Sequence, residues 1–139
     1  MVVTLHACDT ATDYALHNAV CRGARMILSV PCCQHELNGQ IASDKLKLIT
    51  RYGIIKERFA ALMTDAIRAN LLESRGYKTQ VLEFVDLSHT PKNLLIRAIK
   101  KRPALDNAGR IALDEAKALM EEFSLEPTLY SLLYPHSAD

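Results

Sequence analysis

The sequence predicts a single α/β domain over residues 1–139, in which parallel strands and one antiparallel strand form a sheet flanked by helices. A strand, a helix and a buried strand follow one another at the start of the chain, as in a βαβ unit with two parallel strands. A long amphipathic helix comes next. Two later strand-like segments are joined by a link too short for a helical crossover, so we expect them to pair antiparallel.

The first βαβ unit is predicted from short local signals. A β-branched run marks a strand at residues 2–6, and a helix over about 13 to 22 follows, with Thr12 as its N-cap and Gly23 at its end. The strand at 24–30 is almost entirely apolar at its centre and stops at Pro31. We therefore expect this second strand to be buried.

The middle of the chain passes from a polar stretch, residues 34–44, into a helical pattern. The helix is predicted from apolar residues spaced by three and four, namely Ile55, Phe59, Leu62, Met63, Ala66, Ile67 and Leu71, and Gly76 should cap its C-terminus. Strands are expected at 77–85 and 93–100, with a helix over 92–101 as the alternative to the second. These strands form the predicted antiparallel pair.

The C-terminal part is predicted to be helical. Pro103 and Gly109 indicate a loop, and a stripe from Ala112 to Phe123 indicates a last long helix. Pro127 is placed to open a final short helix.

Composition and charge limit the function classes. The chain is 49% hydrophobic and 24% charged, which is typical of one globular domain, and its net charge is +1. A strong overall attraction to nucleic acid or anionic membranes is therefore excluded, although a local basic patch is not. The apolar runs are far shorter than the roughly 20 residues of a membrane-spanning helix, and His6 and Asp9 interrupt the first of them. We expect a cytoplasmic protein.

Polar and titratable side chains gather after three of the predicted strands. The groups are His6, Cys8, Asp9, Thr10, Thr12 and Asp13; then Pro31, Cys32, Cys33, Gln34, His35 and Glu36; and then Asp86, His89, Thr90, Lys92 and Asn93. Ligands of open α/β sheets bind outside the carboxyl ends of the parallel strands, so these loops are predicted to converge on one site. The alternative is that loops after strands are simply polar. The Cys and His content favours a site, since ordinary loops are rich in Gly, Ser and Asn.

Two of these segments resemble a known family. They are Leu5-His6-Ala7-Cys8-Asp9-Thr10-Ala11-Thr12-Asp13 and Val30-Pro31-Cys32-Cys33-Gln34-His35-Glu36-Leu37. They are similar to a Rossmann-like (class I) methyltransferase domain shared by bacterial proteins and eukaryotic tRNA 2′-O-methyltransferases, in which a strand ending in His-x-Cys-Gly-x-x-Thr-Asp precedes one ending in Pro-Cys-Cys. With residues 83–85 and 89–93, the resemblance covers roughly residues 2 to 100. The chain departs from the motif at Asp9, where many relatives carry Gly.

The resemblance implies an S-adenosylmethionine-dependent methyltransferase, of which this chain matches strands four to seven. No Gly-x-Gly segment occurs in the 139 residues, so we expect most of the cofactor site to be absent and the isolated chain to be inactive. By the same analogy, His6, Ala7 and Cys8 lie near the cofactor. The catalytic candidates are Asp9, Asp13 and His35, and the acceptor is expected beside Pro31, Cys32, Cys33, His89 and Asn93.

Asp9 is open to two interpretations. Methyl transfer is helped by holding the acceptor in line and removing its proton, and the Asp9 carboxylate is suited to both tasks. His35, or a water held by Asp13, would replace it in relatives that lack the carboxylate. Alternatively, Asp9 or Thr12 only caps the following helix.

The cysteines allow three interpretations. Cys8, Cys32 and Cys33, with His6 and His35, could bind a metal or an iron–sulfur cluster. A thiolate could act as a nucleophile. Our prediction is the third, in which small polarizable side chains pack beneath the site without a metal. A disulfide framework is not expected, because neighbours such as Cys32 and Cys33 seldom reach disulfide geometry.

The methyl acceptor is not identified by the sequence. RNA is possible by analogy, and the basic cluster Arg97, Lys100, Lys101 and Arg102 would then contact phosphates, although such a run is usually a solvated face. The alternative function is a non-catalytic half-domain, which would form a homodimer or pair with another chain to cover an exposed first strand.

Overall fold

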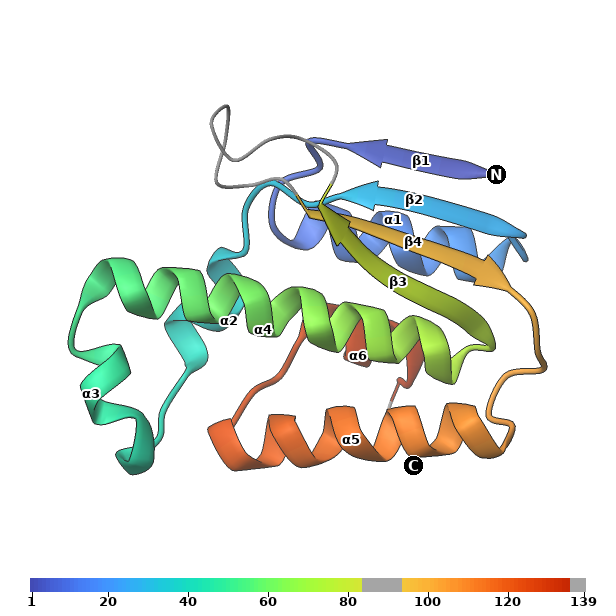
Figure 1. Ribbon diagram of the computed structural model, residues 1–139. Coiled ribbons are helices and arrows are strands. Elements are labelled where there is room, and N and C mark those ends of the chain that lie inside the picture. Colours follow the sequence, from blue (N-terminus) through green and yellow to red (C-terminus); the bar gives the residue numbers. More distant parts are fainter. Residues whose placement is uncertain (84–93, 136–139) are drawn as a thin grey trace.

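The computed structural model describes residues 1–83 and 94–135 (Figure 1). Its strands are β1 (Val2–Leu5), β2 (Met26–Val30), β3 (Tyr77–Glu83) and β4 (Leu94–Lys100). Its helices are α1 (Thr10–Cys21), α2 (His35–Gln40), the 3₁₀ helix η1 (Asp44–Leu46), α3 (Lys47–Thr50), α4 (Gly53–Ser74), α5 (Asn107–Phe123) and α6 (Thr128–Leu133). Within these residues, no helix is long and apolar enough to cross a membrane.

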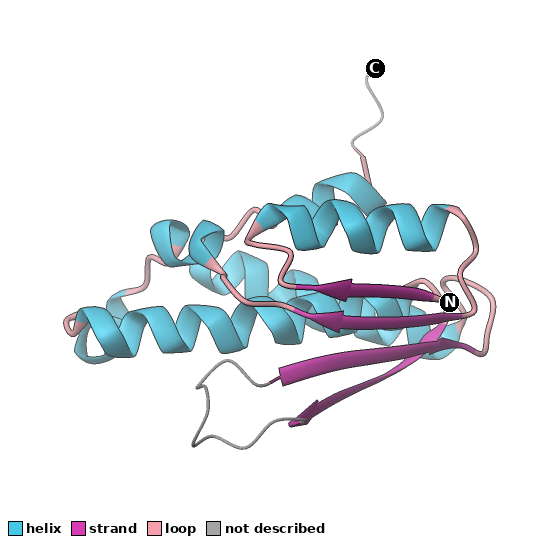
Figure 2. Ribbon diagram, turned by 90° about the horizontal axis from the view of Figure 1, so that it is seen from above, coloured by secondary structure: helices cyan, strands magenta, loops and turns pink. Residues whose placement is uncertain are grey.

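The strands form one open sheet in the order β1-β2-β4-β3. β1 and β2 are parallel, with Val2 beside Ile27, whereas β4 runs antiparallel to both β2 and β3 (Figure 2). The predicted α/β fold with one antiparallel strand is thus confirmed, and the helical alternative for residues 94–100 is wrong. The sequence predicted the β3–β4 pair, but not that β4 lies between β3 and β2.

One face of the sheet is covered by the helices of the described residues. Ile27, Ile96 and Ala98 point to this face and are fully buried. α1 connects β1 to β2 and α4 lies on the path from β2 to β3, both steps running in the same direction across the sheet. Because such crossovers are right-handed, both helices lie on the same side. α1 and α4 form the layer next to the sheet, and α5 and α6 pack on the outer side of that layer (Figure 1).

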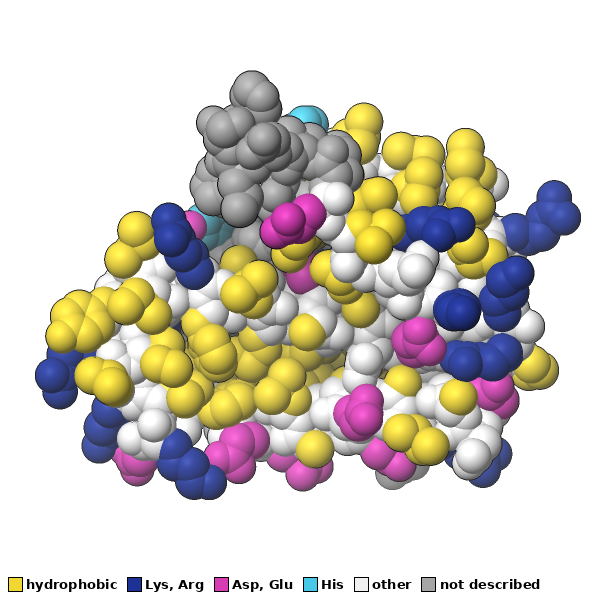
Figure 3. Space-filling view, in the orientation of Figure 1, with side chains coloured by type: hydrophobic (Ala, Val, Ile, Leu, Met, Phe, Trp, Pro, Cys, Tyr) yellow, Lys and Arg dark blue, Asp and Glu magenta, His cyan; other side chains and the backbone are white. Residues whose placement is uncertain are grey.

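The other face of the sheet is apolar and partly exposed. Val3 and Leu5 of β1 are 49% and 63% exposed, and Leu82 of β3 is 39% exposed. Figure 3 shows hydrophobic side chains gathered over β1 and β2 at the upper right of the molecule. β1 is also an edge strand of the sheet, as predicted, and β3 forms the other edge.

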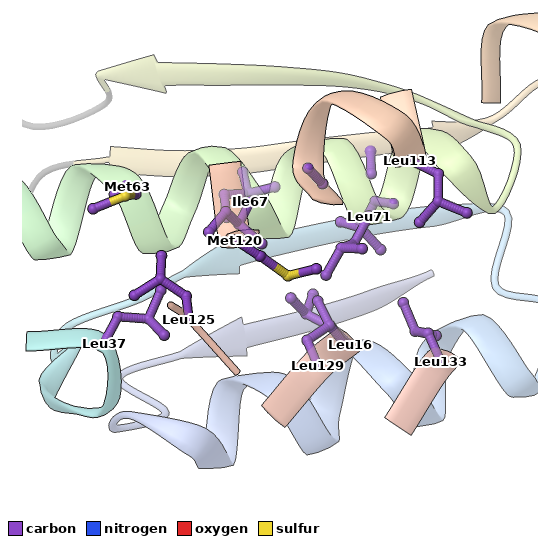
Figure 4. Packing of buried hydrophobic residues seen from close by; sticks show 14 of the residues in the cluster. Leu16, Leu37, Met63, Ile67, Leu71, Leu113, Met120, Leu125, Leu129 and Leu133 are labelled. Carbon is purple, nitrogen blue, oxygen red and sulfur yellow. The ribbon is translucent and has the colours of Figure 1, made fainter. Parts of the chain in front are cut away.

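The hydrophobic core lies between the covered face of the sheet and the outer helices (Figure 4). Leu16 of α1 meets Leu129 of α6 there, and Ile67 and Leu71 of α4 lie near Met120 of α5. The apolar spacing predicted Met63, Ile67 and Leu71 of this stripe correctly, and each is at least 94% removed from solvent. It was wrong for Ile55, Leu62 and Ala66, which are exposed. Burying a Leu or Ile side chain contributes about 1.5–3 kcal/mol, so this core carries much of the stability.

Two local predictions are wrong, and one helix was not predicted. α1 begins at Thr10, and the Thr12 hydroxyl, which donates to the Ala7 carbonyl oxygen at 2.6 Å, does not cap it. Gly109 belongs to α5 and not to a loop, since the Asp106 carboxylate caps that helix by accepting the Gly109 N–H at 2.8 Å. The polar stretch 34–44 contains α2, which Leu37 anchors in the core.

Gly76 ends α4, as predicted, with a positive φ of 88°. A Cβ at this position would lie 2.1 Å from the backbone oxygen of Arg102. Only glycine tolerates both conditions.

We expect Gly76→Ala to lower the free energy of unfolding by at least about 2 kcal/mol, because it combines a left-handed backbone with a backbone clash. Gly53→Ala at the start of α4 is the matched control, since a Cβ there meets nothing within 4 Å. Its effect should stay below about 1 kcal/mol. Urea denaturation of both variants checks this, and equal effects would contradict it.

Candidate functional site

The loop after β1 and the loop after β2 meet at the carboxyl end of the parallel pair. The Asp9 N–H donates to the Cys33 carbonyl oxygen at 3.1 Å. The Asp9 carboxylate oxygen Oδ1 accepts the N–H groups of His35 and Glu36, both at 3.0 Å. The predicted convergence of these two loops is therefore present, and Asp9 is the residue that links them.

Asp9 has an unusual backbone conformation, with φ 47° and ψ −123°. This region favours glycine, which agrees with the Gly that the resembling motif carries at the position. The Asp9 side chain does not cap α1. Its hydrogen bonds go to the first N–H groups of α2. The interpretation that Asp9 or Thr12 caps the helix that follows them is therefore wrong, and the helix whose first N–H groups bind Asp9 is α2. The N–H groups of His35 and Glu36 bind the same carboxylate oxygen of Asp9, Oδ1.

Beneath the loops, Arg68 of α4 forms a buried ion-pair network that the sequence analysis missed. Its Nε and Nη2 bind the two carboxylate oxygens of Asp13 at 2.8 and 3.0 Å, and its Nη1 binds Asp65 at 3.1 Å. Nη2 also donates to the Asp9 carbonyl oxygen at 2.9 Å. Gln34 completes the network by donating to Asp65 at 2.9 Å. Arg68, Asp13 and Asp65 are each no more than 3% exposed.

Burial and charge pairing in this network shift two pKa values. Burial raises the pKa of Asp65 from its ordinary 3.8 to about 6, and the neighbouring Arg68 offsets only part of that rise. Burial acts to lower the pKa of Arg68, but its hydrogen bonds and charge pairing with Asp13, and then with Asp65, outweigh it and raise the pKa. Arg68 therefore stays charged. Asp13, a predicted catalytic residue, has both carboxylate oxygens bound to Arg68.

Three cysteine thiols lie together at the surface of the same loops. The Sγ atom of Cys8 is 3.1 Å from that of Cys32 and 3.8 Å from that of Cys33, and the last two are 3.6 Å apart. The hydrogen bond with Cys8, burial and the Cys33 thiol together raise the pKa of Cys32 to about 12. Cys21, at the far end of α1, is not part of the cluster and lies 3.3 Å from His17 Nε2.

The other predicted site residues are only partly brought together. The side chains of His6 and His35 are exposed, and Pro31 is fully buried behind the loops. Ala7 contributes its carbonyl oxygen to Thr12. His89 and Asn93 lie outside the described residues.

Lys100, Lys101 and Arg102 of the basic cluster lie at the opposite end of the sheet from this site, whereas Arg97 is paired with Leu28 in the middle of β2. The Lys100 N–H donates to the Arg25 carbonyl oxygen just before β2, whereas Cys32 follows the last residue of that strand. From Arg25 to Val30 the strand spans about 16 Å at the usual rise per strand residue, and Cys32 lies two residues further on. Arg102 is paired with Glu73 and Asp106, and Arg97 donates to Gln80.

The comparisons with known proteins point to the same part of the chain. A family model described as a methyltransferase domain matches residues 1–40, which contain β1, α1, β2 and α2. No curated protein and no solved structure matches the chain. The match supports a methyltransferase-like function and covers the Asp9 loop, the cysteine cluster and His35.

We expect Arg68→Met to lower the free energy of unfolding by about 3–5 kcal/mol, because it leaves two buried carboxylates without their cation. Arg58→Met is the matched control on the exposed side of the same helix, and should change stability by less than about 0.5 kcal/mol. Chemical denaturation followed by circular dichroism measures both. A loss below 1 kcal/mol for Arg68→Met would show that the network does not hold the fold.

Asp65 should make stability depend on pH. Its pKa of about 6 is higher than in the unfolded chain, so the folded state binds the proton more tightly. The resulting stabilisation is complete below the unfolded pKa and is lost as the pH rises through about 6. Between pH 5 and pH 7, the contribution of this group to the free energy of unfolding should fall by about 1 kcal/mol. Urea denaturation of the wild type and Asp65→Asn over this range should show a smaller decline in the variant; identical slopes would refute the assignment.

Proposed function

We propose that this chain forms the acceptor side of an S-adenosylmethionine-dependent methyltransferase. The observation that carries the proposal is the junction of the two loops through Asp9, within the 40 residues that match a methyltransferase domain. The junction lies at the carboxyl end of parallel strands, where open α/β sheets bind their ligands.

The residues present fit one wall of a cofactor site. Cys8 and His6 are exposed beside Asp9, and both His6 and Asp9 have positive φ values, which turn this loop sharply at the end of β1. We assign His6, Ala7 and Cys8 to the neighbourhood of the methyl donor. The remaining contacts would come from protein that lies beside the outer edge of β1. When bound, S-adenosylmethionine supplies an electrophilic methyl group.

Asp9 is the residue that we propose acts on the acceptor. Its Oδ1 is fixed by two N–H groups, and no group among the described residues donates to Oδ2. A carboxylate held in this way can orient an acceptor O–H or N–H and take its proton as the bond to carbon forms. We assign Cys32 and Cys33 to the opposite wall, with the buried Pro31 behind them. His35 and Asp13 are the remaining catalytic candidates, with Asp13 acting through Arg68.

RNA is the acceptor class that we propose first, on the resemblance to tRNA methyltransferases. The basic cluster adds no support, since most of it lies at the other end of the sheet and the side chains of Arg97, Lys100 and Arg102 are engaged within the protein. His89 and Asn93 stay proposed acceptor contacts.

The test is a methyl-transfer assay on the tagged chain isolated from its own cells with its associated proteins. Tritiated S-adenosylmethionine is added, and label is counted separately in RNA, protein and small molecules. We expect label in one fraction, and a kcat about 10²–10⁴-fold lower for Asp9→Asn with little change in cofactor affinity. Asn can still accept both N–H groups, so the fold is preserved.

Asp114→Asn, an exposed carboxylate on α5, is the control and should leave turnover unchanged. Unchanged turnover in Asp9→Asn would return that residue to a purely structural role. Absence of label in every fraction would contradict the proposed function. By calorimetry, the purified 139-residue chain alone should bind S-adenosylhomocysteine weakly or not at all. Low-micromolar binding would refute the proposal that the remaining cofactor contacts come from protein beside β1.

A second candidate function is a non-catalytic module that pairs with another chain or with itself. This function is favoured by the exposed apolar face around Val3, Leu5 and Leu82, and by the position of β1 at an edge of the sheet. Light scattering on the purified chain gives its mass in solution. A dimer that yields no methyl transfer in the assay above would favour this function.

A further inference from the structure

The cysteine cluster has the dimensions of a metal site. A tetrahedral zinc ion with bonds of about 2.3 Å to sulfur places its sulfur ligands about 3.8 Å apart. The distances from Cys33 Sγ to the Sγ atoms of Cys32 and Cys8 are 3.6 and 3.8 Å. The Cys8–Cys32 pair, at 3.1 Å, has to open by only about 0.7 Å to reach the same value.

The cluster is assembled by long-range contacts and not by adjacency alone. Cys8 follows β1, and Cys32 and Cys33 follow β2, so the parallel pairing of these strands brings the thiols together. The hydrogen bond from the Asp9 N–H to the Cys33 carbonyl oxygen fixes the two loops at the same point. Among the described residues, these three are the group whose ligand atoms can meet at one ion.

We propose that Cys8, Cys32 and Cys33 bind one thiophilic divalent cation, with Zn²⁺ as the best fit. Three sulfur ligands select zinc over the harder Mg²⁺ and Ca²⁺, which prefer oxygen. Each Zn–S bond replaces an S–H bond, and the proton passes to solvent, so full binding releases three protons. Cys8 is exposed, which leaves the fourth position to water or to a ligand from solution.

The geometry favours a metal over a disulfide as the use of this cluster. A disulfide between Cys8 and Cys32 would employ two thiols and need an oxidant, leaving Cys33 beside them. A cation employs all three. Bound there, it would tie the loop after β1 to the loop after β2 on the outer side, while Asp9 ties them on the inner side. This inference goes beyond the proposed methyl transfer and does not depend on it.

The experiment is a zinc titration of the purified 139-residue chain, stripped by a chelator and kept in a phosphine reductant. Competition with a chromophoric chelator gives stoichiometry and affinity. We expect one Zn²⁺ per chain, and at least about 10–100-fold weaker binding for Cys8→Ser, Cys32→Ser and Cys33→Ser. Cys21→Ser is the matched control and should keep its affinity within about 2-fold.

A second measurement uses only the wild type, so it decides the matter even if a serine variant fails to fold. With Zn²⁺ bound, iodoacetamide should label Cys21 and spare the other three cysteines, as read by peptide mass spectrometry. The proposal would be overturned if no zinc binds, if labelling is equal with and without zinc, or if Cys21→Ser loses zinc binding. A disulfide among the three cysteines that persists in the phosphine reductant would also overturn it. None of these readouts requires a methyl donor, so failure here leaves the proposed function untouched.

Discussion

The buried guanidinium of Arg68 is the interaction on which the rest of the site depends. It belongs to α4, yet it holds α1 through Asp13 and the loop after β1 through the Asp9 carbonyl oxygen. Through Asp65 it also reaches Gln34, which precedes α2. Burying an ion costs several kcal/mol, and only close and complete pairing offsets that cost. The long helix in the middle of the chain therefore fixes loops that lie far from it in sequence.

This support explains how Asp9 keeps a conformation that disfavours side chains. Its N–H, its carbonyl oxygen and its carboxylate are each held by a different segment: the loop at Cys33, Arg68, and the start of α2. Strained backbone persists where the surroundings determine it several times over, and such places are often functional. A glycine would adopt the same φ at no cost, but it would not join α2 to the loop. Asp9 thus supplies a link as well as a charge, and a glycine would supply neither.

The sequence predicted what local patterns encode. β-branched and apolar runs located all four strands, and spacings of three and four located α4 and α5. The network around Arg68 was missed because its partner Asp13 lies 55 residues away. The local sequence signal for this network is the Asp65 and Arg68 pair, which has i,i+3 spacing and lies beside the buried Ile67 of α4. Asp106, three residues before Gly109, is a local signal for the cap of α5, although a glycine at position 109 favours a loop.

The order in which the chain crosses the sheet relates the site to the exposed apolar face. Both crossovers step the same way, so their helices share one face, and the other face keeps Val3 and Leu5 exposed. The same β1 ends in the loop that carries Cys8 and Asp9. A strand added parallel to the outer edge of β1 would therefore present its own C-terminal loop beside these two residues. Contacts that cover the apolar face and contacts that complete the site would then come from one neighbour.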